Sequence, residues 1–190
     1  MNTTAVILAA GAGVRLGGVA KALLVGKNGR TFLANILTTA RVSGVESAIV
    51  VVGPPFGDAV AAHARELGAH VVVNDEPERG MASSVVVGFS AVDDSDAAWL
   101  WPVDHPNVAA NTLHMLVSAL MNHDAARPVY AGRGGHPPLI GRSLIAKLAE
   151  CDEVPGGARA VLAAADTIDV AVDDPGCVRD IDTPVDLEGM

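Results

Sequence analysis

The sequence is poor in cysteine, in basic residues and in long apolar runs. Its two cysteines, Cys151 and Cys177, form no metal-ligand spacing, which indicates free thiols in a reducing cytosol. Lysine and arginine together number 13 against 22 acidic residues, and the net charge of −9 argues against a general nucleic-acid or anionic-membrane surface. The apolar stretch Ala5–Ala10 is too short for a signal peptide or a membrane span. We therefore expect a cytoplasmic protein without nucleic-acid or membrane partners.

Aromatic residues are also scarce, at 3%, whereas half of the residues are apolar. Most of these are alanine, valine and leucine, a composition typical of helices packed on a buried parallel sheet. A chain of 190 residues fits one domain, and no linker or internal repeat interrupts it. The composition thus predicts an α/β fold in a single domain spanning residues 1–190.

Apolar runs alternate with helical patterns along the chain, as repeated βα units require. Asp58 is a candidate N-cap, and Gly44 and Gly68 stand where helix C-terminal glycines belong. The stretch from Gly132 to Gly141 is predicted to be a loop. The predicted strands are Ala5–Ala9, Ser47–Val52, His70–Val73, Ala98–Val103, Pro128–Tyr130 and Thr167–Val172, and the predicted helices are Thr31–Val42, Asp58–Leu67, Ala82–Val92, Thr112–Met121, Ser143–Glu150 and Ala158–Ala164.

The segment Leu8–Lys21, which follows the first strand, carries the local basic site that an anionic ligand would need. Gly11 and Gly13 let the backbone turn and bring its N–H groups against phosphate oxygens. Arg15 adds a planar fork of donors, and Lys21 adds a point charge. A plain strand-to-helix turn would explain the glycines but not the two cations beside them. The loop therefore favours phosphate binding.

Two common phosphate-binding loops do not fit this segment. A P-loop requires GxxxxGK[ST], but Lys21 follows Ala20 and precedes Ala22. The dinucleotide fingerprint requires glycine at its sixth position, which Leu16 occupies, and glycine comes one residue late. A nicotinamide-binding Rossmann domain is therefore disfavoured.

The combined pattern Leu8-Ala9-Ala10-Gly11-x-Gly13-x-Arg15-x-Gly17, followed by Lys21-Ala22-Leu23-Leu24, resembles that of the MobA-like nucleotidyltransferases. Within that family it is most similar to the molybdenum cofactor cytidylyltransferases. The resemblance implies a three-layer α/β/α fold with a mostly parallel sheet, the Rossmann-like nucleotide-diphospho-sugar transferase fold. It also implies nucleotide contacts from Leu8, Ala9, Ala10, Gly11, Gly13, Arg15 and Lys21, with catalytic roles for Arg15 and Lys21.

Two acidic segments could hold a metal ion. Asp104 directly follows the strand Ala98–Val103, and carboxylates at the carboxyl edge of a sheet suit Mg²⁺. A turn aspartate before Pro106 is the plainer interpretation. Asp180 and Asp182 alternate along an extended segment, so only one of them can face the ligand crevice. The resemblance implies that Asp104, a catalytic residue, and Asp182 bind the metal, and Asp180 is left undecided.

Two further loops could contact the substrates. Ser83 or Ser84 could simply cap a helix, but the resemblance implies nucleotide contacts from Gly80 and Ser84. His136 and Arg133 lie in a dense loop, where they could be an ordinary loop histidine and a solvated charge. The resemblance implies that both face the acceptor, where they could hydrogen-bond its phosphate.

The implied reaction is Mg²⁺-dependent nucleotidyl transfer from a nucleoside triphosphate to a phosphorylated small-molecule acceptor, with release of pyrophosphate. Ala10 resembles the cytidine-using branch, because a second glycine stands there in the guanosine-using branch. This favours CTP as the nucleotide, and the resemblance implies molybdopterin as the acceptor. Two alternatives stay open: a sugar- or polyol-phosphate nucleotidyltransferase, and a non-catalytic nucleotide-binding partner of a client molybdoenzyme.

Overall fold

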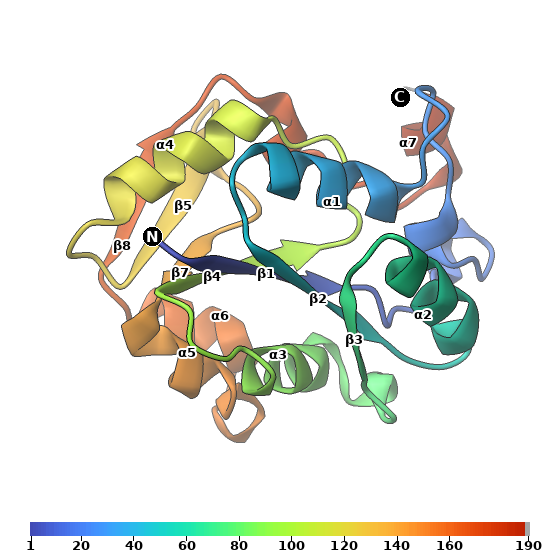
Figure 1. The fold of residues 1–190 in the computed structure, drawn as a ribbon, viewed down its shortest axis with the longest axis horizontal. Coiled ribbons are helices and arrows are strands. Elements are labelled where there is room, and N and C mark those ends of the chain that lie inside the picture. The colour runs from blue at the N-terminus through green and yellow to red at the C-terminus, as the bar shows by residue number, and fades with distance from the viewer. Residues whose placement is uncertain (189–190) are drawn as a thin grey trace.

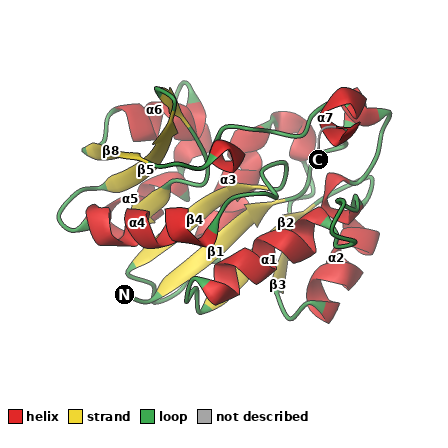
Figure 2. Ribbon diagram, turned by 90° about the horizontal axis from the view of Figure 1, so that it is seen from above, coloured by secondary structure: helices red, strands yellow, loops and turns green. Residues whose placement is uncertain are grey.

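The structure, a computed structural model, describes residues 1–188, without the side chains of Arg15, Pro184 and Glu188. Its described strands form one eight-stranded sheet in the order β3-β2-β1-β4-β7-β5-β6, with β8 paired to β5 (Figures 1 and 2). The strands are β1 (Thr3–Leu8), β2 (Ser47–Val52), β3 (His70–Val73), β4 (Ala97–Pro102), β5 (Ala125–Tyr130), β6 (Arg133–Gly134), β7 (Leu139–Gly141) and β8 (Thr167–Ala171).

Most of the strand pairs are parallel. β1 lies between β2 and β4, β2 pairs with β3, and β5 pairs with β8, all in parallel. β7 is antiparallel to both β4 and β5, and β6 is antiparallel to β5. The carboxyl ends of β1 and β4 therefore meet at one edge of the sheet, where ligands bind in open α/β folds.

Helices cover both faces of the sheet (Figure 1). One face carries α1 (Phe32–Val42), α2 (Gly57–Glu66) and α4 (Ala110–Leu120), and the other carries α3 (Met81–Ser90), α5 (Arg142–Leu148) and α6 (Gly157–Ala163). A short helix, α7 (Pro184–Glu188), follows near the C-terminus. This arrangement confirms the predicted three-layer α/β/α fold with a mostly parallel sheet. No helix among the described residues is both long and apolar enough to cross a bilayer.

Two hydrophobic cores result from the alternation of side chains along the strands. Ile7 and Trp99 contribute to the core beneath α1, α2 and α4, whereas Val6 and Leu100 contribute to the core beneath α3, α5 and α6. All four side chains are buried, and each large apolar side chain contributes about 1.5–3 kcal/mol of burial free energy. Because both faces are covered, the central strands β1, β2 and β4 read as nearly continuous apolar runs.

The structure corrects several element predictions. The stretch predicted as a loop contains β6 and β7, and β5 begins three residues before the predicted Pro128. Periodicity cannot detect β7, because it has only three residues and follows two prolines. Asp58 is not an N-cap: α2 begins at Gly57, and Asp58 lies in its first turn. Gly44 and Gly68 do follow their helices with positive φ, as predicted. Both cysteines are free and buried.

Candidate active site

A cleft of about 330 Å³ opens at the carboxyl ends of β1 and β4, beside the start of α3. We call it the central cleft. Five segments far apart in sequence contribute to it: the loop after β1, Lys21, the loop before α3, the end of β4, and the C-terminal segment. Its lining residues are Leu8, Ala9, Ala10, Gly11, Gly13, Val14, Lys21, Pro77, Gly80, Met81, Ser84, Pro102, Val103, Asp104 and Asp182.

The loop after β1 is held in a turn that requires glycine at position 13. Gly13 has a φ of +58°, and a Cβ atom there would lie 2.0 Å from the carbonyl oxygen of Val19. Its own carbonyl oxygen accepts from the N–H groups of Leu16 and Gly18 at 2.9 and 3.0 Å. This turn bends residues 14–16 into a 3₁₀ helix and returns the chain toward Lys21. The side chain of Arg15 lies outside the described residues.

Lys21 lies between two carboxylates in the central cleft. Its Nζ donates to Asp104 Oδ2 at 3.1 Å and also to Asp182 Oδ1. Burial alone would lower the pKa of Lys21, but the hydrogen bond to Asp182 and the charge of Asp104 outweigh it, so the pKa is raised. The lysine is therefore charged at neutral pH and holds the two acids around a common point.

Hydrogen bonds of the backbone place Asp182 opposite Asp104. The N–H of Ile181 donates to the carbonyl oxygen of Asp104 at 2.9 Å, and the Ile181 side chain is fully buried. Asp186 Oδ2 accepts from the N–H groups of Asp182 and Thr183 at 3.1 and 2.7 Å. The hydrogen bond that the Thr183 hydroxyl donates at 2.7 Å, together with these backbone bonds, favours the charged form and lowers the pKa of Asp186. Asp180, on the other side of Ile181, is exposed and does not line the cleft.

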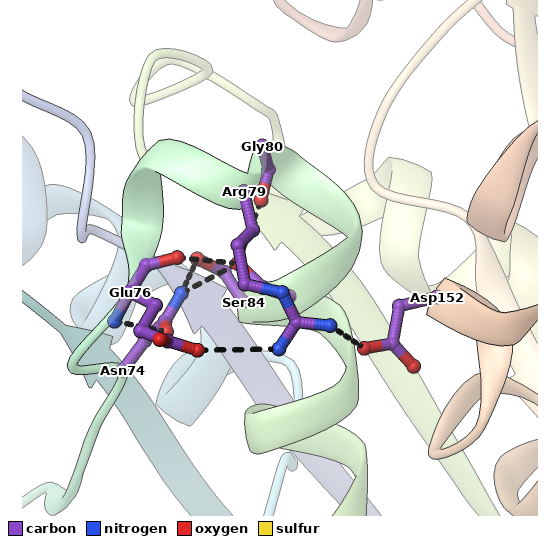
Figure 3. A network of polar contacts seen from close by, with 7 residues as sticks. Asn74, Glu76, Arg79, Gly80, Ser84 and Asp152 are labelled. Atoms are coloured by element: carbon purple, nitrogen blue, oxygen red, sulfur yellow. Dashed lines mark hydrogen bonds and ion pairs between the residues drawn. The ribbon is translucent and has the colours of Figure 1, made fainter.

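The loop before α3 is organised by Asn74, which the sequence analysis missed. Asn74 is 3% exposed, and its amide nitrogen lies 2.8 Å from Ser83 Oγ and 2.9 Å from Ser84 Oγ (Figure 3). Gly80 is the N-cap residue of α3, with a φ of +97°, so neither serine caps this helix. The position of Asn74 directly after the apolar strand β3 was the signal available in the sequence.

The same loop is anchored from outside the cleft. Arg79 donates to Asp152 at 2.7 Å and contacts Glu76 at 3.5 Å (Figure 3). Because Asp152 follows α5, this contact ties the loop to the helices on that face of the sheet. The side chain of Arg79 is 54% exposed, so the pair contributes at most about 1 kcal/mol.

The two residues expected to face the acceptor lie apart from each other. Arg133 is exposed on β6, opposite Tyr130, and does not line the central cleft. His136 packs on His105, with ring centroids 5.0 Å apart, and His105 Nε2 lies 3.9 Å from Asp104 Oδ1. Burial, with a further contribution from His105, lowers the pKa of His136 to about 4. His136 is therefore neutral at physiological pH and lies behind Asp104.

The cleft thus brings together most of the predicted nucleotide and metal residues. The sequence analysis missed Asn74 and the lining residues Val14, Pro77, Met81, Pro102 and Val103. The two acids also fit a divalent cation. Their carboxylate oxygens converge on one ammonium group, and Mg²⁺ takes one or two protein carboxylates together with substrate phosphates.

Comparison with known proteins places this cleft in a family. Residues 5–169 match the MobA-like NTP transferase domain. The chain belongs to this family. Nucleotidyl transfer and a nucleoside triphosphate substrate follow from that membership. The family match ends before Asp182, so that residue rests on the geometry of the cleft.

The relatives that match over nearly the whole chain include an oxidoreductase and the mycobacterial protein Rv0371c. The chain is 31% identical over 191 residues to the nicotine blue oxidoreductase of Paenarthrobacter nicotinovorans, covering 95% of this chain and 92% of that protein. The crystal structure of Rv0371c from Mycobacterium tuberculosis H37Rv superposes with a TM-score of 0.85 at 30% identity, covering 100% and 97% of the two chains. A structure of Rv0371c in complex with manganese has a TM-score of 0.78 at 28% identity and covers both chains fully.

Proposed function

We propose that this family member is a cytidylyltransferase, which transfers CMP from CTP to a phosphorylated acceptor of the molybdopterin class and releases pyrophosphate. One observation carries the proposal: a glycine loop, a charged lysine and two convergent carboxylates line a single cleft. The carboxylates can bind the metal ion, and the loop and the lysine can bind the triphosphate. A phosphate-binding loop alone would contact only the triphosphate.

The residues act mainly by positioning and by neutralising charge. A phosphate oxygen of the acceptor attacks the α-phosphorus of CTP, the bond to the bridging oxygen breaks, and pyrophosphate leaves in line. Backbone N–H groups around Gly11 and Gly13 hold phosphate oxygens, and Lys21 offsets the negative charge that develops on the leaving group. A bound divalent cation would neutralise charge on the phosphate oxygens. Asp104 and Asp182 would hold it.

The preference for CTP rests on Ala10 and the residues near it. Ala10 is 4% exposed and lines the central cleft together with Pro77 and Met81. Its Cβ fills space that a glycine would leave open, which favours the smaller pyrimidine base. On the acceptor side, His136 supports the proposal through its place behind Asp104. Arg133 could contact an acceptor only if that acceptor extended to β6.

A substrate panel tests the proposal. CTP and GTP are each offered with molybdopterin, a polyol phosphate or a sugar phosphate, and pyrophosphate release is measured with Mg²⁺ or Mn²⁺. We expect release with CTP and molybdopterin. D104N and D182N should each reduce the rate at least about 100-fold, the scale of losing one electrostatic contact to a transition state. D180N is the matched control, because Asp180 is exposed on the same segment, and its rate should be unchanged.

The panel also separates the alternatives. Pyrophosphate release with a polyol or sugar phosphate, but not with molybdopterin, would mean that the acceptor is a polyol or sugar phosphate and not molybdopterin. If D104N and D182N retain the full rate, the proposed role of the two carboxylates is wrong. If CTP binds but no acceptor gives pyrophosphate, the protein is a nucleotide-binding partner and not a transferase.

A second candidate function is supported by the full-length identity to a nicotine blue oxidoreductase. Under this alternative, the cleft would bind nicotine blue together with an electron donor such as a dinucleotide cofactor. The loop after β1 lacks glycine at the sixth position of the dinucleotide fingerprint, which weighs against it. Oxidation of NADH or NADPH in the presence of nicotine blue, followed by absorbance, would decide for this activity.

A further inference from the structure

Asn74 joins the end of β3 to the first turn of α3 through a buried amide. Its oxygen accepts from the backbone N–H of Glu76 at 3.1 Å, and its nitrogen donates to Ser83 and Ser84. All three polar side chains are at least nine-tenths buried. Gly80 and Ser84, which belong to this network (Figure 3), line the central cleft.

The orientation of this amide is determined by a group that cannot change its role. A backbone N–H can only donate, so the acceptor atom of Asn74, Oδ1, must face Glu76. The amide nitrogen then faces the two hydroxyl groups, and as a donor it forces both of their oxygens to accept. Asn74 therefore determines how each serine can use its own proton.

The two serines use their protons differently. Ser83 donates to the carbonyl oxygen of Gly80 at 2.8 Å, which completes its bonding within the protein. Within the described part of the chain, the hydroxyl proton of Ser84 has no acceptor, and Ser84 lines the cleft whereas Ser83 does not. Ser84 is thus left with a hydrogen-bond donor for a ligand.

We propose that Asn74 is a positioning residue that directs the Ser84 proton toward the ligand, so that the central cleft favours a nucleotide presenting an acceptor atom at that point. The inference rests on the proposed function and deepens it. The acceptor atom is either the O2 carbonyl of a pyrimidine base or an oxygen of the ribose. A ligand that presents a donor there would use the second lone pair of Ser84 and leave the buried hydroxyl proton without an acceptor, so the site disfavours it.

The substitution N74D tests the polarity directly with almost no change in shape. A carboxylate still accepts from Glu76 N–H, but it presents an acceptor to the serines, so Ser84 now donates to it and offers a lone pair to the ligand. We expect the Kd for CTP, measured by calorimetry without an acceptor, to rise at least about tenfold. S83A is the matched control: it removes the other partner of Asn74 but keeps the polarity of Ser84, and its Kd should change less than about twofold.

A double-mutant cycle distinguishes positioning from a structural role. S84A should lose about as much affinity as N74D, and the double variant N74D/S84A should bind no more weakly than S84A, because Asn74 acts through Ser84. Additive losses would overturn the proposal, as would an unchanged Kd for N74D. If N74D does not fold, S84A decides: unchanged binding overturns the proposal, and reduced binding beside an unaffected S83A supports it.

Nucleotide analogues identify the acceptor atom and separate this inference from the proposed function. If Ser84 donates to the base, 2-thio-CTP should lose affinity in the wild type but not in S84A. If Ser84 donates to the ribose, 2′-deoxy-CTP or 3′-deoxy-CTP should lose affinity for the wild type but not for S84A. Equal losses of affinity in the wild type and S84A for all three analogues would overturn the inference. If the wild type binds no nucleoside triphosphate at all, the proposed function itself fails.

Discussion

His136 is the residue whose effect on stability can be worked out most directly. Burial, with a further contribution from His105, lowers its pKa from the ordinary 6.5 to about 4 in the folded protein. The unfolded chain therefore binds more protons than the folded one between these two values, so stability falls as the pH falls from about 6.5 toward 4. At neutral pH both states are unprotonated, and this contribution disappears.

The magnitude follows from the size of the shift. Each unit of difference in pKa corresponds to about 1.4 kcal/mol, so His136 removes about 2 kcal/mol at about pH 5 and about 3 kcal/mol at about pH 4. This is a large share of the roughly 5–15 kcal/mol that stabilises a typical domain. His105 adds to the effect in the same direction, because burial lowers its pKa as well.

The assay is urea unfolding of the wild type and H136Q at a series of pH values, with a chelator present to exclude metal binding. H136Q loses packing against His105 and should be less stable at neutral pH, but its stability should fall less steeply as the pH is lowered. The difference in unfolding free energy between the wild type and H136Q should be about 2 kcal/mol smaller at about pH 5 than at neutral pH. H123Q is a control, since His123 is partly exposed and paired with Asp166. Parallel pH profiles for H136Q and the wild type would refute the reasoning.

Two further predictions concern the cleft and the core. In K21M, removal of the ammonium group between Asp104 and Asp182 should abolish nucleotidyl transfer. The same substitution should strengthen Mn²⁺ binding to the nucleotide-free protein about tenfold, as measured by calorimetry. K27M, at an exposed site, is the control, and weaker Mn²⁺ binding in K21M would contradict the prediction. In G88A, the new Cβ would lie 2.4 Å from Val6 Cγ1 and 2.8 Å from Val51 Cγ2, so denaturant unfolding should show a loss of about 1–3 kcal/mol. G11A is the control, because its Cβ would meet no atom within 4 Å and Gly11 has no positive φ, so its unfolding free energy should be nearly unchanged.

The sequence predicted the parallel half of the sheet well, because βα units with both faces buried leave a clear pattern. β1, β2, β3 and β4 were each located within two residues. The antiparallel part was missed, since β7 has three residues between two prolines and the following helix. Its pairing with β4 depends on contacts between Trp99 and Leu139, which are 40 positions apart and have no local signal.

The candidate site divides in the same way. Gly13, Lys21 and Asp104 follow strands, where spacing and residue type are visible in the sequence. The contact of Lys21 with both acids depends on the register of Ile181 against Asp104, which only the folded chain determines. Asn74 acts through serines nine and ten positions away, and its role follows from hydrogen-bond direction and not from a motif. Whether Arg15 reaches the cleft stays a prediction.

The hydrogen bond between Ile181 and Asp104 also has a consequence for synthesis of the protein. The ribosome releases a chain from its N-terminus, so the N-terminal residues of a site are made first. Every strand of the sheet, through β8 at Ala171, precedes Asp182 in the chain. A chain that stops before Asp182 therefore contains every described strand of the sheet and the glycine loop but lacks one of the two carboxylates. Such a product would have the glycine loop but lack half of the acidic pair, so only chains that extend through Asp182 carry the whole site.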